Sequence, residues 1–199
     1  KRMNQGDVIN VEKITFCPNS GTHMDAPFHF VKDGITVEQA DPGVIAGSAV
    51  VVDLRHKEDG APIEKKDVTD WEERTGEKIR EGDAVLLMTG FSRYWELNDK
   101  EEKFLLKKWP YITRSVADYF LEKKIRLVGV ESMDLDLIDP LDLSASEFIG
   151  HRTFLPNGIY IIENLTNLDQ IGQTRCSIIA SPLKIKGATG SPVRVIAIV

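Results

Sequence analysis

Three short apolar runs constrain the fold of this 199-residue chain most strongly. Residues 48–54, 84–88 and 125–130 are each dominated by β-branched or other apolar side chains, which predicts strands buried on both faces of a sheet. Helical patterns lie between these runs, over residues 67–76 and 113–124. Strands that alternate with helices indicate the α/β class. We therefore expect a central mixed β-sheet flanked by helices, in a single domain that spans residues 1–199.

Weaker patterns predict the remaining elements. Residues 144–147 have the Ser-to-Glu spacing of a capping box, so a short helix is expected before Gly150. Gly187, Gly190 and Pro192 are expected to mark a loop. Alternating or continuous apolar residues predict further strands over residues 8–16, 159–164, 177–180, 183–186 and 193–199.

Residues 19–30 place two of the four histidines and a carboxylate close together. Gly21 and Pro27 both oppose a helix, so this segment is expected to be a kinked strand or loop. In an extended chain His23 and Asp25 share one face and could bind the same ion. Asn19 can join them only if the chain bends at Gly21, and His29 follows just beyond. An ordinary turn with solvent-exposed histidines is the simpler interpretation of an isolated His-x-Asp.

Two later residues could complete such a site. Glu163 ends a strongly apolar run, where a carboxylate is costly unless it is paired or bound to a cation. It could equally emerge into solvent at the end of its strand. His151 precedes that strand and is a candidate second ligand, whereas His56 lies in a charged turn and is expected at the surface.

Composition excludes several classes of partner. A formal charge of -6 and a pI near 5.3, without a basic stripe, argue against nucleic acid and favour a small-molecule substrate. No apolar run is long enough to span a membrane, and no secretory leader is visible. Cys17 and Cys176 form no Cys-x-x-Cys pattern, which favours a reducing, cytoplasmic compartment. Cys17 could be a weak ligand, although a small buried thiol is the commoner case.

Residues 21–30, from Gly-Thr-His through Asp and Pro to His-Phe, resemble the signature of the metal-dependent cyclase hydrolases, a family that includes bacterial kynurenine formamidases and isatin hydrolases. The similarity extends to residues 82–90 and 128–130, to the spacing between His151 and Glu163, and to residues 182–194. The resemblance implies a swivelling β/β/α fold and a homodimer or homotetramer. It also implies hydrolysis of a C–N bond in an amide, a cyclic imide or an arylformamide such as the N-formylkynurenine of tryptophan catabolism.

The resemblance further implies a role for each candidate residue. His23 and Asp25 would bind a first metal ion, with Asp25 able to bridge to a second ion held by His151 and Glu163. His29 would be the general acid/base. Two histidines and two carboxylates suit one or two ions of Zn²⁺ or Mn²⁺ that hold a water molecule.

Asn19 departs from the family pattern, which has histidine at this position. An amide oxygen is neutral and harder than imidazole, so zinc affinity should fall and Mn²⁺, Mg²⁺ or Ca²⁺ should be better tolerated. A non-catalytic small-molecule or metal-binding protein on the same scaffold is therefore the alternative to a hydrolase. A lyase or true cyclase is a third reading.

Overall fold

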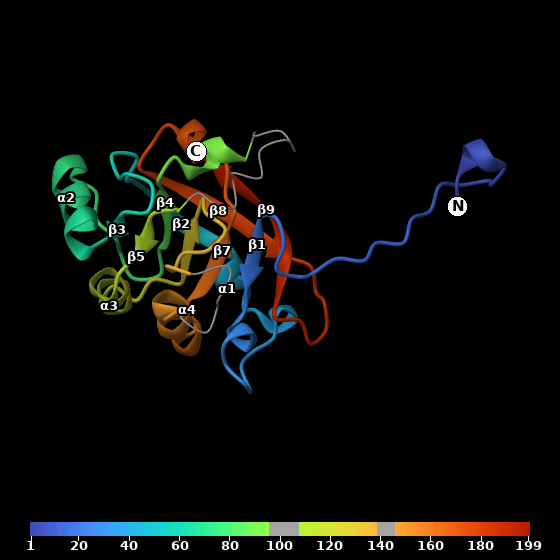
Figure 1. Ribbon diagram of the computed structural model, residues 1–199, viewed down its shortest axis with the longest axis horizontal. Helices are drawn as coiled ribbons and strands as arrows, with labels where there is room; N and C mark the ends of the chain where they lie inside the picture. Colours follow the sequence, from blue (N-terminus) through green and yellow to red (C-terminus); the bar gives the residue numbers. More distant parts are fainter. Residues whose placement is uncertain (96–107, 139–145) are drawn as a thin grey trace.

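A mixed sheet of seven strands closes on itself to form a barrel in the computed structural model (Figure 1), which describes residues 1–95, 108–138 and 146–199. The strand order around the barrel is β1-β7-β6-β4-β2-β8-β9. A separate parallel pair, β3 with β5, lies outside it. The bounds are β1 His23–Asp25, β2 Ala46–Asp53, β3 Pro62–Ile63, β4 Ala84–Met88, β5 Tyr111–Ile112, β6 Leu127–Val130, β7 Tyr160–Glu163, β8 Arg175–Pro182 and β9 Gly190–Ile198.

The barrel has a parallel half and an antiparallel half. Strands β2, β4, β6 and β7 run parallel to one another, so their carboxyl ends meet at one rim. Strands β8 and β9 form an antiparallel hairpin that joins β2 on one side. The three-residue strand β1 closes the barrel because it pairs antiparallel with both β7 and β9.

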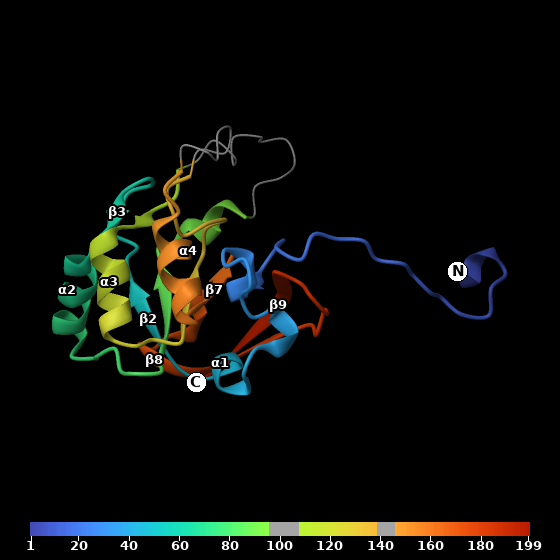
Figure 2. The same ribbon diagram turned by 90° about the horizontal axis from the view of Figure 1, so that it is seen from below.

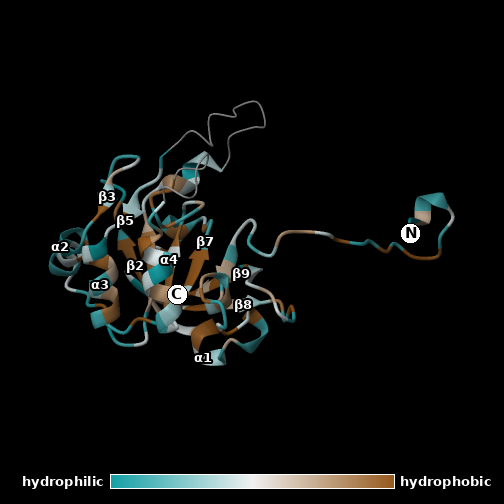
Figure 3. Ribbon diagram, turned by 60° about the horizontal axis from the view of Figure 1, so that its bottom comes forward, coloured by the Kyte–Doolittle hydropathy of each residue, from teal (hydrophilic) through white to brown (hydrophobic). Residues whose placement is uncertain are grey.

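Side chains that alternate along the strands pack in two separate hydrophobic cores. Ala49 and Val51 of β2 point into the barrel, whereas Val50 and Val52 point outward, into a second core shared with the helices. Figure 2 shows α2, α3 and α4 on the same side of the barrel, and Figure 3 shows the apolar strands beneath them. The helices are α1 Pro42–Ile45, α2 Lys65–Thr75, α3 Arg114–Glu122 and α4 Ile149–Phe154, with single 3₁₀ turns at η1 Met3–Gln5, η2 Pro27–His29, η3 Val37–Gln39, η4 Phe91–Tyr94, η7 Leu155–Asn157 and η8 Leu168–Ile171.

The α/β class, the mixed sheet and the main elements predicted from the sequence are confirmed. The three apolar runs form β2, β4 and β6, and the two helical patterns form α2 and α3. Gly76 ends α2 in the left-handed conformation, and Thr113 is the N-cap residue of α3. Residues 159–164, 177–180 and 193–199 contribute to β7, β8 and β9. The swivelling β/β/α arrangement and the single-domain assignment stay predictions.

Two predicted strands, one end of a predicted loop and a predicted short helix differ from the structure. Residues 8–16 form no strand: residues 1–17 are exposed and extend away from the barrel (Figures 1 and 2), where no neighbouring strand offers hydrogen bonds. Residues 183–186 connect β8 to β9, and Pro192 lies within β9 rather than in a loop. Gly150 lies inside α4, which begins at Ile149, and residues 146–148 directly before this helix are not helical. Ser144 of the expected capping box lies outside the described residues.

Two smaller expectations have clear outcomes. Cys17 is an exposed thiol rather than a buried one, and Cys176 is the buried cysteine. Within the described ranges, no helix has the length and apolar character that a membrane crossing requires.

Candidate metal centre

Strand β1 places His23 and Asp25 on one face and Met24 on the other. Gly21 has φ +62° and turns the chain into β1, as expected for a residue that tolerates the left-handed region. Met24 enters the core inside the barrel. His23 lies directly opposite Glu163 in the pairing of β1 with β7, so His23, Asp25 and Glu163 share the outer face of the barrel.

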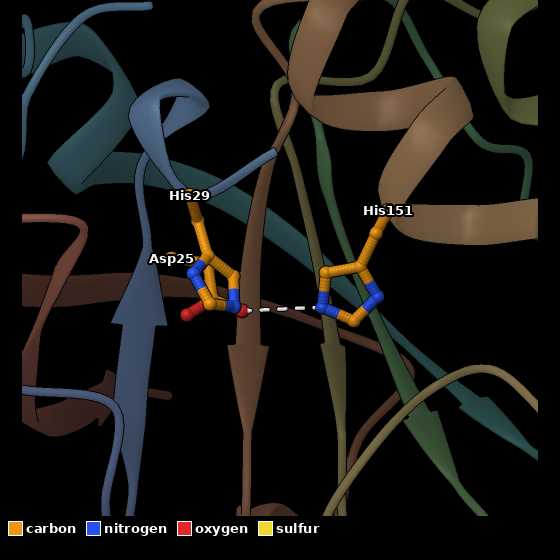
Figure 4. Close-up of side chains that lie close together, drawn as sticks. All are labelled: Asp25, His29 and His151. Atoms are coloured by element: carbon orange, nitrogen blue, oxygen red, sulfur yellow. Dashed lines mark ion pairs between the residues drawn. The ribbon is translucent and has the colours of Figure 1, made fainter. Parts of the chain in front are cut away.

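Helix α4 brings His151 to the same face. Figure 4 shows the side chains of Asp25, from β1, and His151, from α4, meeting beside His29. The ring of Phe30 stacks on His151 with 4.5 Å between ring centroids, which fixes the plane of the imidazole. Phe148, the N-cap residue of α4, adopts φ +50°, a strained conformation for a bulky side chain, at the edge of this cluster.

Hydrogen bonds aim both imidazoles at the two carboxylates. His23 donates Nδ1–H to the Gly21 carbonyl over 2.8 Å, which leaves Nε2 3.3 Å from Asp25 Oδ1 and 3.5 Å from Glu163 Oε2. His151 donates Nδ1–H to Asp136 Oδ2 over 2.8 Å, which leaves Nε2 3.5 Å from Asp25 Oδ2 and 3.6 Å from Glu163 Oε1. Each carboxylate therefore offers one oxygen to each histidine, an arrangement suited to bridging two ions.

The chemistry of these donors fits divalent cations. All four side chains are buried, and two of the oxygens, Asp25 Oδ2 and Glu163 Oε1, have no hydrogen-bond partner. An unsatisfied buried carboxylate oxygen is costly unless a cation neutralises it. Two imidazole nitrogens and four carboxylate oxygens are ligands that Zn²⁺ and Mn²⁺ accept.

Burial and charge shift the pKa values of these groups in opposite directions. Burial, with the nearby carboxylates of Asp134 and Asp25, raises the pKa of Glu163 well above its usual range. Burial acts the same way on Asp25, but the close imidazoles of His151 and His23 outweigh it and lower the pKa of that carboxyl. Burial acts to lower the pKa of His151, yet its hydrogen bond to Asp136 and the nearby Asp25 carboxylate raise that pKa overall.

His29 lies at the edge of the cluster rather than within its ring of hydrogen bonds. It ends the turn η2, which follows β1. One ring nitrogen of His29 lies within 4.8 Å of a carboxylate oxygen of Asp25 and of a ring nitrogen of His151. Burial lowers the pKa of His29, although the Asp25 carboxylate partly opposes that effect. The neutral imidazole therefore predominates at pH 7, as a general base requires.

Asn19 reaches the cluster because the chain bends, as the sequence required. Its Nδ2 donates to Asp25 Oδ1 and its Oδ1 accepts a hydrogen bond of 2.7 Å from Thr189 Oγ1. Gly190 lies opposite Asp25 in β9, and a Cβ there would come within 2.6 Å of Asn19 Nδ2. The absence of a side chain at Gly190 thus makes room for the Asn19 amide.

Sequence reasoning missed two carboxylates that follow β6. Asp136 accepts hydrogen bonds from the backbone N–H groups of Gly150 and His151 as well as from the His151 ring. Asp134 lies 3.8 Å from His151 Nδ1, and burial raises its pKa to about 6. The available signal was a pair of acids, two residues apart, in the loop that follows a buried strand.

The remaining candidates lie away from this centre. His56 is exposed, as expected, with its Nε2 4.0 Å from Asp67. A cleft of about 580 Å³ opens near the ends of β4 and β6, with Met88 and Glu131 among its lining residues. None of its lining residues belongs to the histidine and carboxylate cluster, and Glu131 is committed to hydrogen bonds from Gly90 N–H and Ser92 Oγ. The buried cluster is therefore the better candidate for chemistry.

Known proteins share this arrangement of sequence and fold. The model of the Cyclase family matches residues 3–137. The kynurenine formamidase of Bacillus cereus is 35% identical over 188 residues, which cover 94% of this chain and 79% of the relative. Isatin hydrolase A from Labrenzia aggregata, solved with benzyl benzoate, superposes with a TM-score of 0.78 at 28% identity, covering 93% of this chain and 75% of the other. A solved structure described as a potential metal-dependent hydrolase with cyclase activity gives a TM-score of 0.73 at 28% identity and covers 93% and 81%.

Proposed function

Because this chain belongs to the Cyclase family, we propose that it is a metal-dependent hydrolase of a C–N bond other than a peptide bond, with an amide, an arylformamide or a cyclic imide as substrate. The observation that carries the proposal is the meeting of His23, Asp25, His151 and Glu163 on one face of the barrel. Their Nε2 and carboxylate oxygen atoms approach within 3.3 to 3.6 Å, and two of the oxygens have no other partner.

The residues that would hold the cation are His23, Asp25, His151 and Glu163, with Asn19 as a further oxygen donor if its amide rotates. We propose Zn²⁺ or Mn²⁺, one or two ions, because imidazole and carboxylate ligands suit both. When bound, such an ion supplies Lewis-acid activation of the substrate carbonyl and of a water molecule.

His29 would move the proton that hydrolysis requires. Water adds its oxygen to the carbonyl carbon, the C–N bond breaks, and its electron pair stays on the nitrogen. His29 is neutral at pH 7 because burial lowers its pKa, so it can accept the proton from water and deliver it to the leaving nitrogen. An arylformamide would give an arylamine and formate.

Aromatic side chains beside the centre favour a planar substrate. Phe30 stacks on His151, and the Phe148 ring lies 5.2 Å from that of Phe30. A flat aryl group gains from such a wall through burial and ring stacking. This favours an arylformamide, as in the kynurenine formamidases, or a lactam fused to an aryl ring, as in the isatin hydrolases, over an aliphatic amide.

The test is hydrolysis by the full chain, stripped with a chelator and then reloaded with Zn²⁺ or Mn²⁺. We expect the reloaded protein to release formate from N-formylkynurenine or to open isatin, and the stripped protein to do neither. A folded, metal-loaded protein that hydrolyses no formamide, lactam or imide in a broad panel would refute the proposal.

A non-catalytic member of the same fold is the second candidate, and Asn19 favours it. The Asn19 amide already bonds Asp25 Oδ1, an oxygen that a metal ion would need. If Asn19→His creates hydrolysis where the natural chain has none, the natural protein is a binding protein that lost catalysis.

We also propose a homodimer or homotetramer, located in the cytoplasm. The extended N-terminal segment leaves Val8, Ile9 and Ile14 at 89%, 52% and 74% exposure, and such apolar side chains are better covered in an assembly. Light scattering after size exclusion would measure the assembly, and a strictly monomeric protein would contradict it.

Both cysteines are unpaired, which suits a reducing compartment.

A further inference from the structure

Asp134 adds a carboxylate to one side of the candidate metal centre. One ligand atom from each of Asp134, His151 and Glu163 lies within 4.8 Å of the others. Asp134 Oδ1 is held by the backbone N–H of Asp136 over 2.7 Å and lies 3.8 Å from His151 Nδ1, so the carboxylate is fixed beside the His151 ring. A second group of possible ligands, His23 with Asp25 and Glu163, lies on the other side and lacks this extra acid.

The two oxygens without hydrogen-bond partners lie on that same side. Asp25 and Glu163 each have one oxygen near His151 and one near His23. The oxygens nearer His151, Asp25 Oδ2 and Glu163 Oε1, are the two without partners, and both side chains are more than 90% buried. The need for a cation is therefore concentrated beside His151.

The side nearer His23 is already partly satisfied. Asp25 Oδ1 accepts a hydrogen bond from Asn19 Nδ2, while Thr189 holds the amide from its other end. A cation beside His23 would have to displace this N–H donor, and the amide that remained would bring no charge. A neutral ligand stabilises a divalent ion less than a carboxylate does.

We propose that the two cation subsites are unequal: His151, Glu163 and Asp134 form the tight one with Asp25 Oδ2, and the subsite beside His23 and Asn19 is the weak one. The inference rests on the metal dependence of the proposed function. What it adds is that Asp134 contributes a carboxylate to the tight subsite, and that the tight subsite fills before the weak one.

Mn²⁺ titration of the chelator-stripped full chain, without substrate, tests this order. Electron paramagnetic resonance of free Mn²⁺ and isothermal calorimetry would count the ions and give each affinity. We expect one tight ion and a second that binds at least about tenfold more weakly. Asp134→Asn should weaken the tight subsite by at least about tenfold, the lower end of the loss seen even for residues that only support a ligand. Asn19→His should strengthen the weak subsite and leave the tight one unchanged.

Asp118→Asn is the matched control, because it makes the same charge change on an exposed position of α3. It should leave both affinities unchanged. Circular dichroism would check that each variant is folded. If Asp134→Asn fails to fold, the two affinities of the unaltered chain and the Asn19→His titration decide the matter.

The outcomes separate this inference from the proposed function. Two equal affinities, or a folded Asp134→Asn variant that binds as the unaltered chain does, would overturn the inference alone. Unequal sites in a protein that hydrolyses nothing would overturn the proposed catalysis and leave the inference standing. A chain that binds neither Mn²⁺ nor Zn²⁺ would overturn both.

Discussion

His29 is the residue whose replacement should separate proton transfer from metal binding. His29→Ala removes the neutral imidazole beside the cluster but none of the four side chains proposed to hold the cation. We expect kcat to fall by about 10²- to 10⁴-fold, the usual contribution of a general acid/base. Elemental analysis should find the metal content unchanged.

The control for this prediction is His56→Ala, which removes an exposed histidine remote from the centre. It should leave both kcat and metal content unchanged. A His29→Ala protein that keeps full kcat would show that another group moves the proton.

Asp136 should act through His151 rather than on the substrate. Its carboxylate accepts the ring Nδ1–H and two backbone N–H groups, which holds Nε2 toward Asp25 and Glu163. Asp136→Asn should lower metal affinity by about 10–100-fold, as removal of such supporting carboxylates typically does. Calorimetric titration with Mn²⁺ measures the change, and unaltered affinity would mean that the stacking of Phe30 alone orients the ring.

The sequence itself marked His23, Asp25, His29 and Glu163 as candidates and the family resemblance added the role of His151, but neither revealed the residues that hold them in place. The density of His23, Asp25 and His29 between Gly21 and Pro27 indicated a site, and a carboxylate at the end of an apolar strand identified Glu163. Asp134 and Asp136 resembled solvated acids, because burial beside His151 depends on contacts that local sequence does not encode.

At the scale of elements, the turn η2 depends on a close approach at Gly34. A Cβ on Gly34 would lie 2.7 Å from the carbonyl carbon of Pro27 and 2.8 Å from the nitrogen of Phe28. These are backbone atoms and cannot swing aside. Gly34→Ala should therefore cost about 1–3 kcal/mol of stability and lower activity, because His29 sits on the displaced turn.

Gly172→Ala provides the comparison for that prediction. Gly172 has φ +70° and open space around its Cα, so alanine there should cost about 1–2 kcal/mol through backbone strain alone. Activity should stay normal. Urea unfolding and kcat are measured on both variants. A Gly34→Ala protein that lost stability without any loss of activity would contradict the prediction.

Elements with strong local signals were predictable, and those that depend on distant partners were not. The runs that became β2, β4 and β6 carry their apolar character in the sequence itself. Residues 8–16 show a similar alternation, yet they meet no partner strand in the described chain and stay extended. The closure of the barrel depends on three residues of β1 that pair with both β7 and β9, and no local pattern reveals that pairing.

At the scale of the whole molecule, Arg175 joins the two halves of the barrel. From β8 it forms a two-pronged pair with Asp83, just before β4, at 2.8 and 3.0 Å, and it also donates to Glu77 and to Ser48 of β2. The Asp83 side chain is 3% exposed. Removal of its charge by Asp83→Asn should cost about 1–3 kcal/mol at pH 7, because the partly buried guanidinium loses a charged partner and one of its two acceptor oxygens.

The pH dependence of that loss has a definite sign. Burial alone would raise the pKa of Asp83, but its hydrogen bonds from Arg175 and the Arg80 backbone hold it below the ordinary value of 3.8. A carboxyl with a lowered pKa in the folded state stabilises the fold above its unfolded pKa and loses this effect as the pH falls through the folded one. The difference in urea unfolding free energy between the natural chain and Asp83→Asn should be full above about pH 4 and should shrink below it. Asp70→Asn, at an exposed pair with Lys66, should change stability little at any pH. A difference for Asp83→Asn that persists undiminished into strong acid would mean that packing, rather than charge, joins β8 to the parallel half.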